Sequence, residues 1–388
     1  MPSFRLALFT GNYNYTRDGS NQSLNRLVRH LQEVAGAKVR VYSPTTPTPA
    51  FEPVGDLISI PSVSVPGRPE YRLGLGLNPA VRRDLLAFAP DIVHLATPDL
   101  LGFQAQKLAR DLGLPVVASV HTRFESYLGY YGLSVLAPLV ERTLRGFYQG
   151  CDQVMAPTLQ MAEAMARRGL RTSVGVWGRG VDRELFDPAR RDPAWRRAQG
   201  LIDDELAVLF VGRIVLEKGL GVFAETLARL RSSHPRVRAL VVGDGPARAG
   251  FEPQLPGARF TGFLTGQELA RAVASADIFF NPSTTEAFGN VNLEAMASGL
   301  PVICADLANS RALIAHEGTG LLCPADSAAD YAAAIARLAD QPEFRRSLGC
   351  EGRAASAAFS WSACLEGMAE VYRRLLDRKA PAVFDRAA

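Results

Sequence analysis

Short apolar runs alternate along this chain with longer segments in which apolar residues recur every three or four positions. In the first half, the short runs predict buried strands and the longer segments predict helices between them. The predicted strands are residues 4–10, 38–42, 91–95, 115–121 and 153–156, and the predicted helices are residues 20–34, 79–88, 100–112 and 159–168. This alternation is typical of an α/β fold, in which helices cover both faces of a parallel sheet.

The same rhythm starts again in the second half of the chain. The predicted strands are residues 206–211, 238–242, 259–261, 277–281, 301–304 and 320–322, and the predicted helices are residues 219–231, 267–274, 290–297, 328–338 and 361–378. The restart predicts two doubly wound, Rossmann-like domains: residues 1–182, joined by a C-terminal helix at about 361–380, and residues 183–360. Ligands of such sheets bind outside the carboxyl ends of the strands, so we expect the site in the cleft between the domains.

Size and composition limit the classes of protein that fit. A chain of 388 residues is too long for one ordinary core, and a net charge of +4 is too small to indicate a nucleic-acid partner. Five cysteines without a C-x-x-C pair fit neither a disulfide framework nor a zinc site. Residues 4–9 predict a strand rather than a signal peptide, and no apolar run reaches the roughly 18–20 residues of a spanning helix. We therefore expect a cytoplasmic protein that at most lies peripherally on the inner face of the cell membrane.

The segment Gly212-Arg213-Ile-Val-Leu-Glu-Lys218-Gly219 follows a predicted strand and carries two cations. A departing nucleoside diphosphate gains negative charge as its glycosidic bond breaks, and fixed cations in a partly dry cleft stabilise that charge better than water does. Arg213 offers a fork of donors and Lys218 a point charge. Gly219 is predicted to open a helix, whose N-terminal N–H groups favour anions. The alternative is a pair of solvated cations on a loop.

The segment Glu286-Ala-Phe288-Gly289-Asn290-Val-Asn-Leu-Glu294 carries two carboxylates. We expect Glu286 in the loop after strand 277–281 and Glu294 in the helix that follows. Backbone N–H groups of residues 288–290, at the helix N-terminus, suit sugar hydroxyls, and Glu294 suits a ribose diol. Glu286 suits the sugar or the positive charge that develops at its anomeric carbon. The alternatives are a carboxylate that only favours the helix dipole and a solvated helix face.

Two further candidates lie in the first half. The loop from Gly11 to Asn21 joins the first strand to the first helix, and glycines at such a junction either let the backbone approach a phosphate or only make a tight turn without a ligand. The loop lacks the G-x-G-x-x-G pattern, which argues against a nicotinamide enzyme. His121 ends a strand, where an imidazole either hydrogen-bonds a sugar hydroxyl or is only structural, and His94 ends another strand. Carboxylates and histidines show no metal-ligand spacing, so we expect neither a metal nor a cofactor.

Together these motifs resemble those of the retaining family 4 glycosyltransferases, which have the GT-B fold, and the resemblance extends over nearly the whole chain. It rests on G-R-x4-K-G at 212–219, E-x7-E at 286–294, the continuation Glu294-Ala-Met-Ala-Ser-Gly299-Leu-Pro301-Val, Arg179-Gly180-Val181-Asp182 with Phe186, and His121 at a strand end.

The resemblance implies which residues act. The implied catalytic residues are His121, Arg213, Lys218 and Glu286. The implied donor-binding residues are Gly19 by the phosphates, Arg213 and Lys218 on the diphosphate, Glu286 with Phe288, Gly289 and Asn290 on the sugar, and Glu294 on the ribose. The family also implies retention of the anomeric configuration by same-face attack without a metal, and a last helix that crosses back to the N-terminal domain.

This chain departs from the family pattern in one stretch. After Asp306 such proteins usually have a Gly-rich pair and then an acidic residue, whereas this chain has Leu307-Ala308-Asn309-Ser310-Arg311-Ala312. The departure leaves the identity of the donor sugar open.

Residues 122–133 are rich in aromatic side chains and resemble the branch of the family that acts on lipid acceptors. That branch includes GDP-mannose-dependent α-mannosyltransferases and sulfoquinovosyl-diacylglycerol synthases. With the apolar residues 133–140 and the cations Arg142 and Arg145, this surface suits a bilayer interface beside anionic headgroups. The alternative is a buried helix next to an acceptor-side loop. The candidate acceptor-side residues are Arg123, Phe124, Tyr127, Tyr130 and Tyr131.

We therefore predict a retaining glycosyltransferase that moves a hexosyl group from a nucleotide-diphosphate sugar, GDP-mannose first, to a hydroxyl of a glycolipid. One alternative is a UDP-sugar donor that carries glucose, glucuronate, sulfoquinovose or N-acetylglucosamine. Another is a transferase or synthase with a soluble acceptor. A third is a sugar-nucleotide-binding protein without activity, against which the intact Arg213, Lys218, Glu286 and Glu294 argue.

Overall fold

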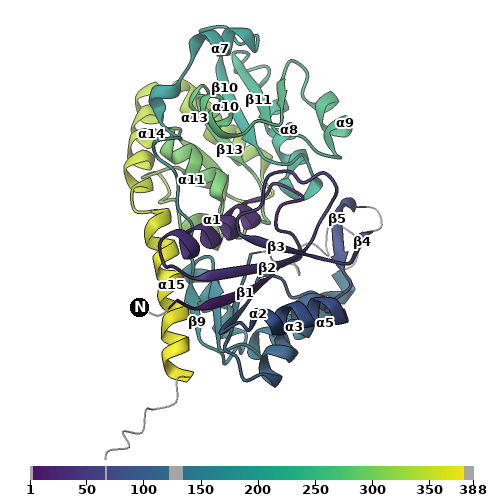
Figure 1. The fold of residues 1–388 in the computed structure, drawn as a ribbon. Coiled ribbons are helices and arrows are strands. Elements are labelled where there is room, and N and C mark those ends of the chain that lie inside the picture. The colour runs from purple at the N-terminus through teal and green to yellow at the C-terminus, as the bar shows by residue number, and fades with distance from the viewer. Residues whose placement is uncertain (1–2, 66–67, 122–133, 380–388) are drawn as a thin grey trace, which may run out of the picture. The chain divides into compact units, whose positions relative to one another are not determined.

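The computed structural model describes residues 3–65, 68–121 and 134–379 (Figure 1). The candidate acceptor-side residues lie outside these ranges: Arg123, Phe124, Tyr127, Tyr130 and Tyr131. The described chain packs as two units, one of residues 3–121, 135–178 and 362–379, and one of residues 179–361. Residues 362–379 of the last helix therefore belong to the same unit as the N-terminus.

The first unit contains a seven-stranded parallel sheet in the order β3-β2-β1-β6-β7-β8-β9. Its strands are β1 Arg5–Phe9, β2 Lys38–Pro44, β3 Asp56–Ile60, β6 Ile92–Leu95, β7 Val116–Ser119, β8 Gln153–Ala156 and β9 Val174–Val176, and β4 Ser62–Val65 and β5 Arg68–Gly74 form a separate antiparallel pair. Its helices are α1 Gly19–Glu33, α2 Pro79–Phe88, α3 Leu100–Asp111, η2 Ser134–Leu136, α5 Ala137–Gln149, α6 Leu159–Arg167 and α15 Trp361–Lys379.

Helices cover both faces of this sheet because alternate residues of each strand point to opposite sides. On β1, Ala7 and Phe9 join the core that α2, α3 and α5 complete. Leu6 and Leu8, also fully buried, point to the other side. Figure 1 shows α1 over one face of the sheet and α2, α3 and α5 over the other.

The second unit contains a six-stranded parallel sheet in the order β12-β11-β10-β13-β14-β15. Its strands are β10 Leu206–Val211, β11 Val237–Val242, β12 Arg259–Gly262, β13 Ile278–Asn281, β14 Val302–Ala305 and β15 Leu321–Cys323. Its helices are η3 Pro188–Arg190, α7 Pro193–Ala198, η4 Leu216–Lys218, α8 Leu220–Leu230, α9 Arg248–Phe251, η5 Glu252–Gln254, α10 Gly266–Ala274, α11 Asn290–Ala297, α12 Ala308–Arg311, α13 Ala328–Asp340 and α14 Pro342–Ser356. Ala207 and Leu209 of β10 face one apolar core, and Val208 and Phe210 face a second.

Both sheets have the same strand order. The first three strands of the sheet run from its middle to one edge, and the next strand returns to the middle, beside the first, so that the later strands extend to the other edge. The return makes β1 a neighbour of β6 in the first unit and β10 a neighbour of β13 in the second. The loops that leave the carboxyl ends of such a pair run to opposite faces of the sheet. Ligands of doubly wound sheets bind at this switch point.

The α/β architecture with two doubly wound parallel sheets agrees with the sequence prediction. Elements that the sequence did not predict have few buried residues. Strand β4 has no fully buried residue, and α14 buries only Leu348, Gly349, Gly352 and Ser356 of its fifteen residues. An element with so little buried surface needs no apolar period, so the pattern does not reveal it.

Candidate functional site

The switch point of the second unit brings two of the predicted motifs together. The loop after β10 contains Arg213 and Lys218, and the loop after β13 contains Glu286. The Lys218 ammonium lies 2.5 Å from Oε1 of Glu286, and both side chains are mostly buried, with 23% and 16% exposed. Arg213, at the end of β10, is half-buried. A cation and a carboxylate from different motifs therefore meet where a ligand of this sheet binds.

Buried hydroxyl and amide groups hold these two loops against each other. Thr285 Oγ1 donates to the carbonyl of Glu217 at 3.1 Å, which ties the residue before Glu286 to the residue before Lys218. Asn281 at the end of β13 donates to the Asn292 side chain on α11 at 2.8 Å. Since these partners are buried, their bonds are expensive to break. The positions of Lys218 and Glu286 are thus fixed by groups that carry no charge.

Two helices begin at the switch point without a side-chain cap. The N-cap of α8 is Gly219, with φ 72°, and the N-cap of α11 is Gly289, with φ 98°; neither helix has a side-chain cap hydrogen bond. A Cβ at Gly219 would lie 2.9 Å from the carbonyl oxygen of Pro282, so only glycine fits there. The prediction that Gly219 opens the helix is corrected by one residue, because its left-handed backbone makes it the cap and α8 begins at Leu220.

The remaining donor-side candidates differ in how much side chain they offer. Phe288 is 6% exposed and packs against Phe359 with 6.2 Å between ring centroids, so its side chain belongs to the core. Contact of the Phe288 backbone with the donor sugar stays a prediction. Asn290 opens α11, and Glu294 lies half-buried one turn further along the same helix.

Gly19 and His121 belong to the first unit. Gly19 is exposed at the start of α1, next to Asp18, whose carboxylate accepts from the N–H groups of Ser20 and Asn21, both at 2.9 Å. A carboxylate at that position repels a phosphate and already satisfies two first-turn donors. The role of Gly19 beside the phosphates stays a prediction.

His121 is half-buried and follows Val120 after β7, which ends at Ser119 and not at His121 as the sequence predicted, and its Nε2 lies 2.7 Å from Ser119 Oγ. The Ser119 hydroxyl also lies 2.6 Å from Nε2 of His94, whose Nδ1 lies 2.6 Å from the hydroxyl of Tyr372 on α15. The sequence pointed to His121 and to His94, and it missed Ser119 and Tyr372. Ser119 carried an available signal, because it is a polar residue that ends an otherwise apolar strand, as Asn281 does at the end of β13. Tyr372 lies on a helix and had no such signal.

The stretch that departs from the family pattern borders a pocket of about 380 Å³ at the ends of β14 and β15. Its lining residues are Asp306, Arg311, Ile314, His316 and Leu322. Arg311 donates to both carboxylate oxygens of Asp306, at 2.6 and 2.8 Å, and this bond holds the pKa of Asp306 below its ordinary value. The stretch that departs from the family pattern therefore contributes Arg311 to an ion pair with the preceding Asp306.

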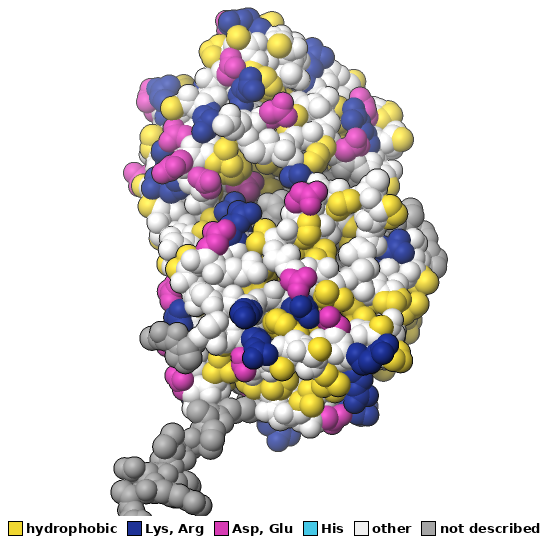
Figure 2. Space-filling model, viewed as in Figure 1, with side chains coloured by type: hydrophobic (Ala, Val, Ile, Leu, Met, Phe, Trp, Pro, Cys, Tyr) yellow, Lys and Arg dark blue, Asp and Glu magenta, His cyan; other side chains and the backbone are white. Residues whose placement is uncertain are grey.

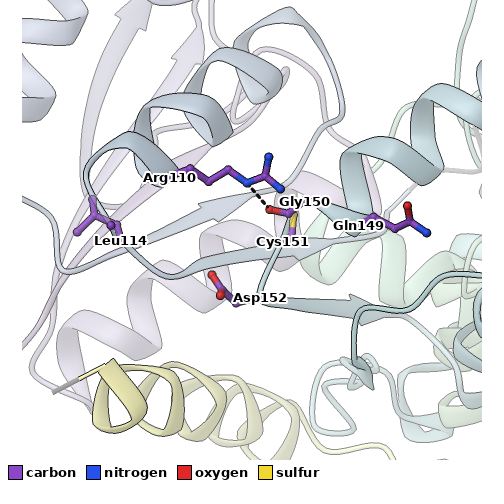
Figure 3. A pocket seen from close by; sticks show the side chains of 7 residues that line it. Arg110, Leu114, Gln149, Gly150, Cys151 and Asp152 are labelled. Atoms are coloured by element: carbon purple, nitrogen blue, oxygen red, sulfur yellow. Dashed lines mark hydrogen bonds between the residues drawn. The ribbon is translucent and has the colours of Figure 1, made fainter. Parts of the chain in front are cut away.

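A second pocket, of about 330 Å³, lies in the first unit, at the edge of the sheet where its strands begin (Figure 3). The Asp152 carboxylate in its wall accepts from the N–H of Val116 at 2.7 Å, which places the pocket at the amino ends of β7 and β8. Burial raises the pKa of the Cys151 thiol to about 12, so the thiol is not a nucleophile there. The pocket lies at the edge of the sheet where ligands of this fold do not bind.

Within residues 3–65, 68–121 and 134–379, no three His, Cys, Asp or Glu side chains gather as a metal site. No helix of the same ranges combines the length and the apolar character that crossing a bilayer requires.

Two family models match the chain, one in each half. A model described as Glycosyltransferase Family 4 matches residues 17–185, and a model described as Glycosyl transferases group 1 matches residues 205–341. The first match includes Gly19 and His121, and the second includes Arg213, Lys218, Glu286 and Glu294.

Full-length relatives agree with these matches. The chain is 33% identical over 382 residues to a GDP-mannose-dependent alpha-mannosyltransferase of Mycolicibacterium smegmatis, which covers 97% of this chain and 99% of that protein. It is 31% identical over 369 residues to the sulfoquinovosyl transferase SQD2 of Arabidopsis thaliana, which covers 92% of this chain and 71% of that protein. Among solved structures, the sucrose-phosphate synthase from Thermosynechococcus elongatus matches with a TM-score of 0.77 at 24% identity, over 97% of this chain and 100% of that one.

Proposed function

The chain belongs to glycosyltransferase family 4 and has the GT-B fold, and on that premise we propose that it transfers a hexosyl group from GDP-mannose to a hydroxyl of a glycolipid, with retention of configuration. The observation that carries the proposal is the Lys218–Glu286 pair at the switch point of the second sheet. It combines a cation for a diphosphate with a carboxylate for a sugar, between two helix N-termini without side-chain caps.

Donor binding exchanges the partners of this pair. The diphosphate takes Lys218 and Arg213 as its cations, and Glu286, released from Lys218, accepts hydrogen bonds from sugar hydroxyls. The first-turn N–H groups of α11 face the same sugar, and Glu294 takes the ribose diol. The exchange places the donor so that its phosphate lies on the cations and its sugar on the carboxylate.

The reaction breaks the bond between the anomeric carbon and the β-phosphate oxygen and forms a bond from that carbon to the acceptor oxygen on the same face. The acceptor hydroxyl loses its proton to the departing phosphate oxygen. Arg213 and Lys218 stabilise the negative charge that grows on the diphosphate, and Glu286 faces the positive charge at the anomeric carbon. In this proposal the two side-chain cations do the work that a metal does elsewhere, so no metal is required.

An apolar surface with nearby cations supports a lipid acceptor and peripheral binding to an anionic membrane. On η2 and α5, Val135 and Leu139 are 84% and 63% exposed, and Arg142 and Arg145 on α5 are exposed as well. Figure 2 shows hydrophobic side chains gathered near α3 and α5, with Lys and Arg side chains among them. Such a surface suits the boundary between acyl chains and anionic headgroups.

A UDP-sugar donor is the second candidate. The relatives named for GDP-mannose and for sulfoquinovose are 33% and 31% identical to this chain, too close to separate the donors. The stretch after β14 also departs from the family pattern and carries the Asp306–Arg311 ion pair, so the pattern does not fix the sugar.

A donor panel tests the proposal. The purified protein is given GDP- and UDP-sugars with and without a membrane lipid extract, and nucleotide release is measured, with Lys218→Ala as the blank. Release from GDP-mannose only in the presence of lipid supports the proposal, and release from a UDP-sugar replaces the donor. No release from any sugar nucleotide in the presence of lipid contradicts it.

Flotation with anionic vesicles at low salt tests the proposed membrane binding separately. Protein that does not float with the vesicles contradicts peripheral binding to an anionic membrane.

A further inference from the structure

A buried line of hydrogen-bonding groups runs through the first unit and ends at His121. The hydroxyl of Tyr372 on α15 lies 2.6 Å from Nδ1 of His94 on β6. Nε2 of His94 lies 2.6 Å from the Ser119 hydroxyl on β7, and that hydroxyl lies 2.7 Å from Nε2 of His121. Three short hydrogen bonds thus connect side chains from α15, β6 and β7 with His121, which follows β7.

The surroundings of this line are apolar. Tyr372 and His94 are fully buried and Ser119 is 2% exposed. The Trp177 ring meets both imidazoles edge-on, at 6.1 Å from His94 and 5.4 Å from His121 between centroids. Because no bulk water reaches the first three groups, each proton in the line has to find its acceptor within it.

The protons can be counted from the buried end. Burial lowers the pKa of His94 to about 3, so its ring is neutral and carries a single N–H. Burial also raises the pKa of Tyr372 well above its ordinary value, so the phenol keeps its proton. Within the described part of the chain, the one hydrogen-bond partner found for that hydroxyl is Nδ1 of His94. If His94 Nδ1 carried the proton, the buried Tyr372 hydroxyl would have no acceptor, which is costly.

The remaining directions follow one after another. Tyr372 donates to Nδ1 of His94, so the single N–H of His94 is on Nε2 and donates to Ser119. Ser119 then donates its own proton to Nε2 of His121. We infer that Tyr372 is a positioning residue, which fixes His121 in the tautomer that carries its proton on Nδ1.

This inference rests on the proposed function and gives His121 a defined part in it. With Nε2 as an acceptor in this line and the proton on Nδ1, a neutral His121 is a hydrogen-bond donor through Nδ1 and has no unprotonated nitrogen left to act as a general base. The contact of His121 with the sugar that the family resemblance implies would then be made by a donor. Tyr372 on the last helix sets this state of His121 through three bonds.

Nitrogen NMR of the histidine rings tests the tautomer directly. The chain has five histidines, so ring-labelled protein gives few signals, and single His→Gln variants assign them. We expect a protonated Nδ1 and an unprotonated Nε2 for His121 in the wild-type protein at neutral pH. In Tyr372→Phe the bias on His94 is lost, and His121 should become a mixture of the two tautomers. Ser119→Ala, which cuts the line at a different bond, should also release His121 from the single Nδ1–H form.

A matched control exists in the second unit. Tyr331 is also fully buried, and its hydroxyl has no hydrogen-bond partner among the described residues. Tyr331→Phe removes the same atom from an equally buried ring and should leave the His121 signals unchanged. A change in Tyr331→Phe as large as that in Tyr372→Phe would attribute the effect to packing and overturn the inference.

Kinetics supply the second readout. Tyr372→Phe should lower kcat/KM by roughly two- to tenfold, the size of one neutral hydrogen bond. In a His121→Ala background the same substitution should have no further effect, because Tyr372 acts only through His121. Additive losses would contradict that route.

The outcomes separate this inference from the proposed function. A wild-type His121 protonated on Nε2, or a His121 tautomer that Tyr372→Phe leaves unchanged, overturns the inference even if the enzyme transfers sugar as proposed. If no sugar is transferred at all, the proposed function fails while the NMR result still decides the tautomer. If Tyr372→Phe does not fold, the wild-type spectrum and Ser119→Ala decide it.

Discussion

The loop after the first strand of each sheet can be compared directly, because both sheets have the same strand order. In the first unit, this loop ends at Asp18, whose carboxylate caps α1. In the second unit, it ends with Lys218 and the left-handed Gly219, and α8 has no side-chain cap. The N-terminus of α1 is therefore capped by a carboxylate of the chain itself, whereas the first N–H groups of α8 have no side-chain cap and suit an anionic ligand.

The loops on the other side of the two switch points differ in the same way. After β6, Thr97 Oγ1 accepts from the N–H of Gly11 at 2.7 Å, and the buried carboxylate of Asp99 accepts from Gly102 at 2.8 Å. Burial raises the pKa of Asp99, so even this carboxylate is poorly placed to hold charge. After β13, by contrast, Glu286 is held by Lys218 of the neighbouring loop. Strand order supplies two equivalent places, and the capping residues and charges that distinguish them are the reason we propose the second for the diphosphate.

The largest expected effect comes from the cation at the second switch point. Lys218→Ala should lower the turnover of the accepted donor by at least about a hundredfold, as loss of one charge-stabilising group typically does, and Arg213→Ala should act alike. Nucleotide release measures both. The matched control is Arg17→Ala, which removes the cation of the corresponding loop in the first unit, where Arg17 Nε donates to the carbonyl of Ala50 at 3.0 Å. Near-wild-type turnover in Lys218→Ala, or an equal loss in Arg17→Ala, would contradict the proposal that the cations of the second unit, and not that of the first, stabilise the diphosphate.

The second effect is a response to acid that should be confined to the first unit. Burial lowers the pKa of His94 in the folded protein to about 3, against about 6.5 in the unfolded chain. Below about pH 6.5 the imidazole is therefore protonated in the unfolded chain and stays neutral in the folded protein. Stability is therefore fully present above that pH and falls with pH, by about 2 kcal/mol between pH 7 and pH 5.

Hydrogen exchange of β6 and β10 peptides, corrected for the intrinsic rate at each pH, measures this response in each unit. His94→Gln should remove the acid dependence at β6, whereas His316→Gln, in the second unit, should keep it. An equal loss of protection in β10, or a β6 response that survives in His94→Gln, would show that the buried imidazole is not its cause.

The smallest effect concerns two glycines in equivalent loops. Gly219→Ala forces a side chain into a left-handed backbone and against Pro282, at a cost of about 1–2 kcal/mol, and should weaken binding of the nucleoside diphosphate roughly tenfold. Gly19→Ala, within the first turn of α1, should weaken that affinity less than Gly219→Ala does, because Gly19 has no left-handed backbone that excludes a side chain, even if it lies by the phosphates as predicted. Titration of GDP and UDP measures both variants. A loss in Gly19→Ala as large as that in Gly219→Ala would remove the asymmetry.

Local pattern was sufficient for much of the fold. The bounds of α2, β8, β10 and α11 follow from apolar residues a few positions apart, and the structure has the same bounds. Edge elements such as β4 were not predicted, because a strand shows alternation of apolar and polar residues only when one of its faces is buried.

The site was predictable residue by residue, but its pairings were not. Motifs identified Lys218 and Glu286 as separate contacts, one to phosphate and one to sugar. That the two side chains pair depends on β10 lying beside β13, a consequence of strand order that no local window contains. The bond between His94 and Tyr372 joins residues 278 positions apart, so it is beyond any reading of local motifs.

The last helix has a consequence for how this protein is made. Leu365, Met368, Ala369 and Tyr372 are buried in the unit that contains the N-terminus. Residues 179–361 are continuous in sequence, so all of the second unit leaves the ribosome before the segment that completes the first unit. Until that segment emerges, the first unit lacks the apolar side chains with which the last helix covers it.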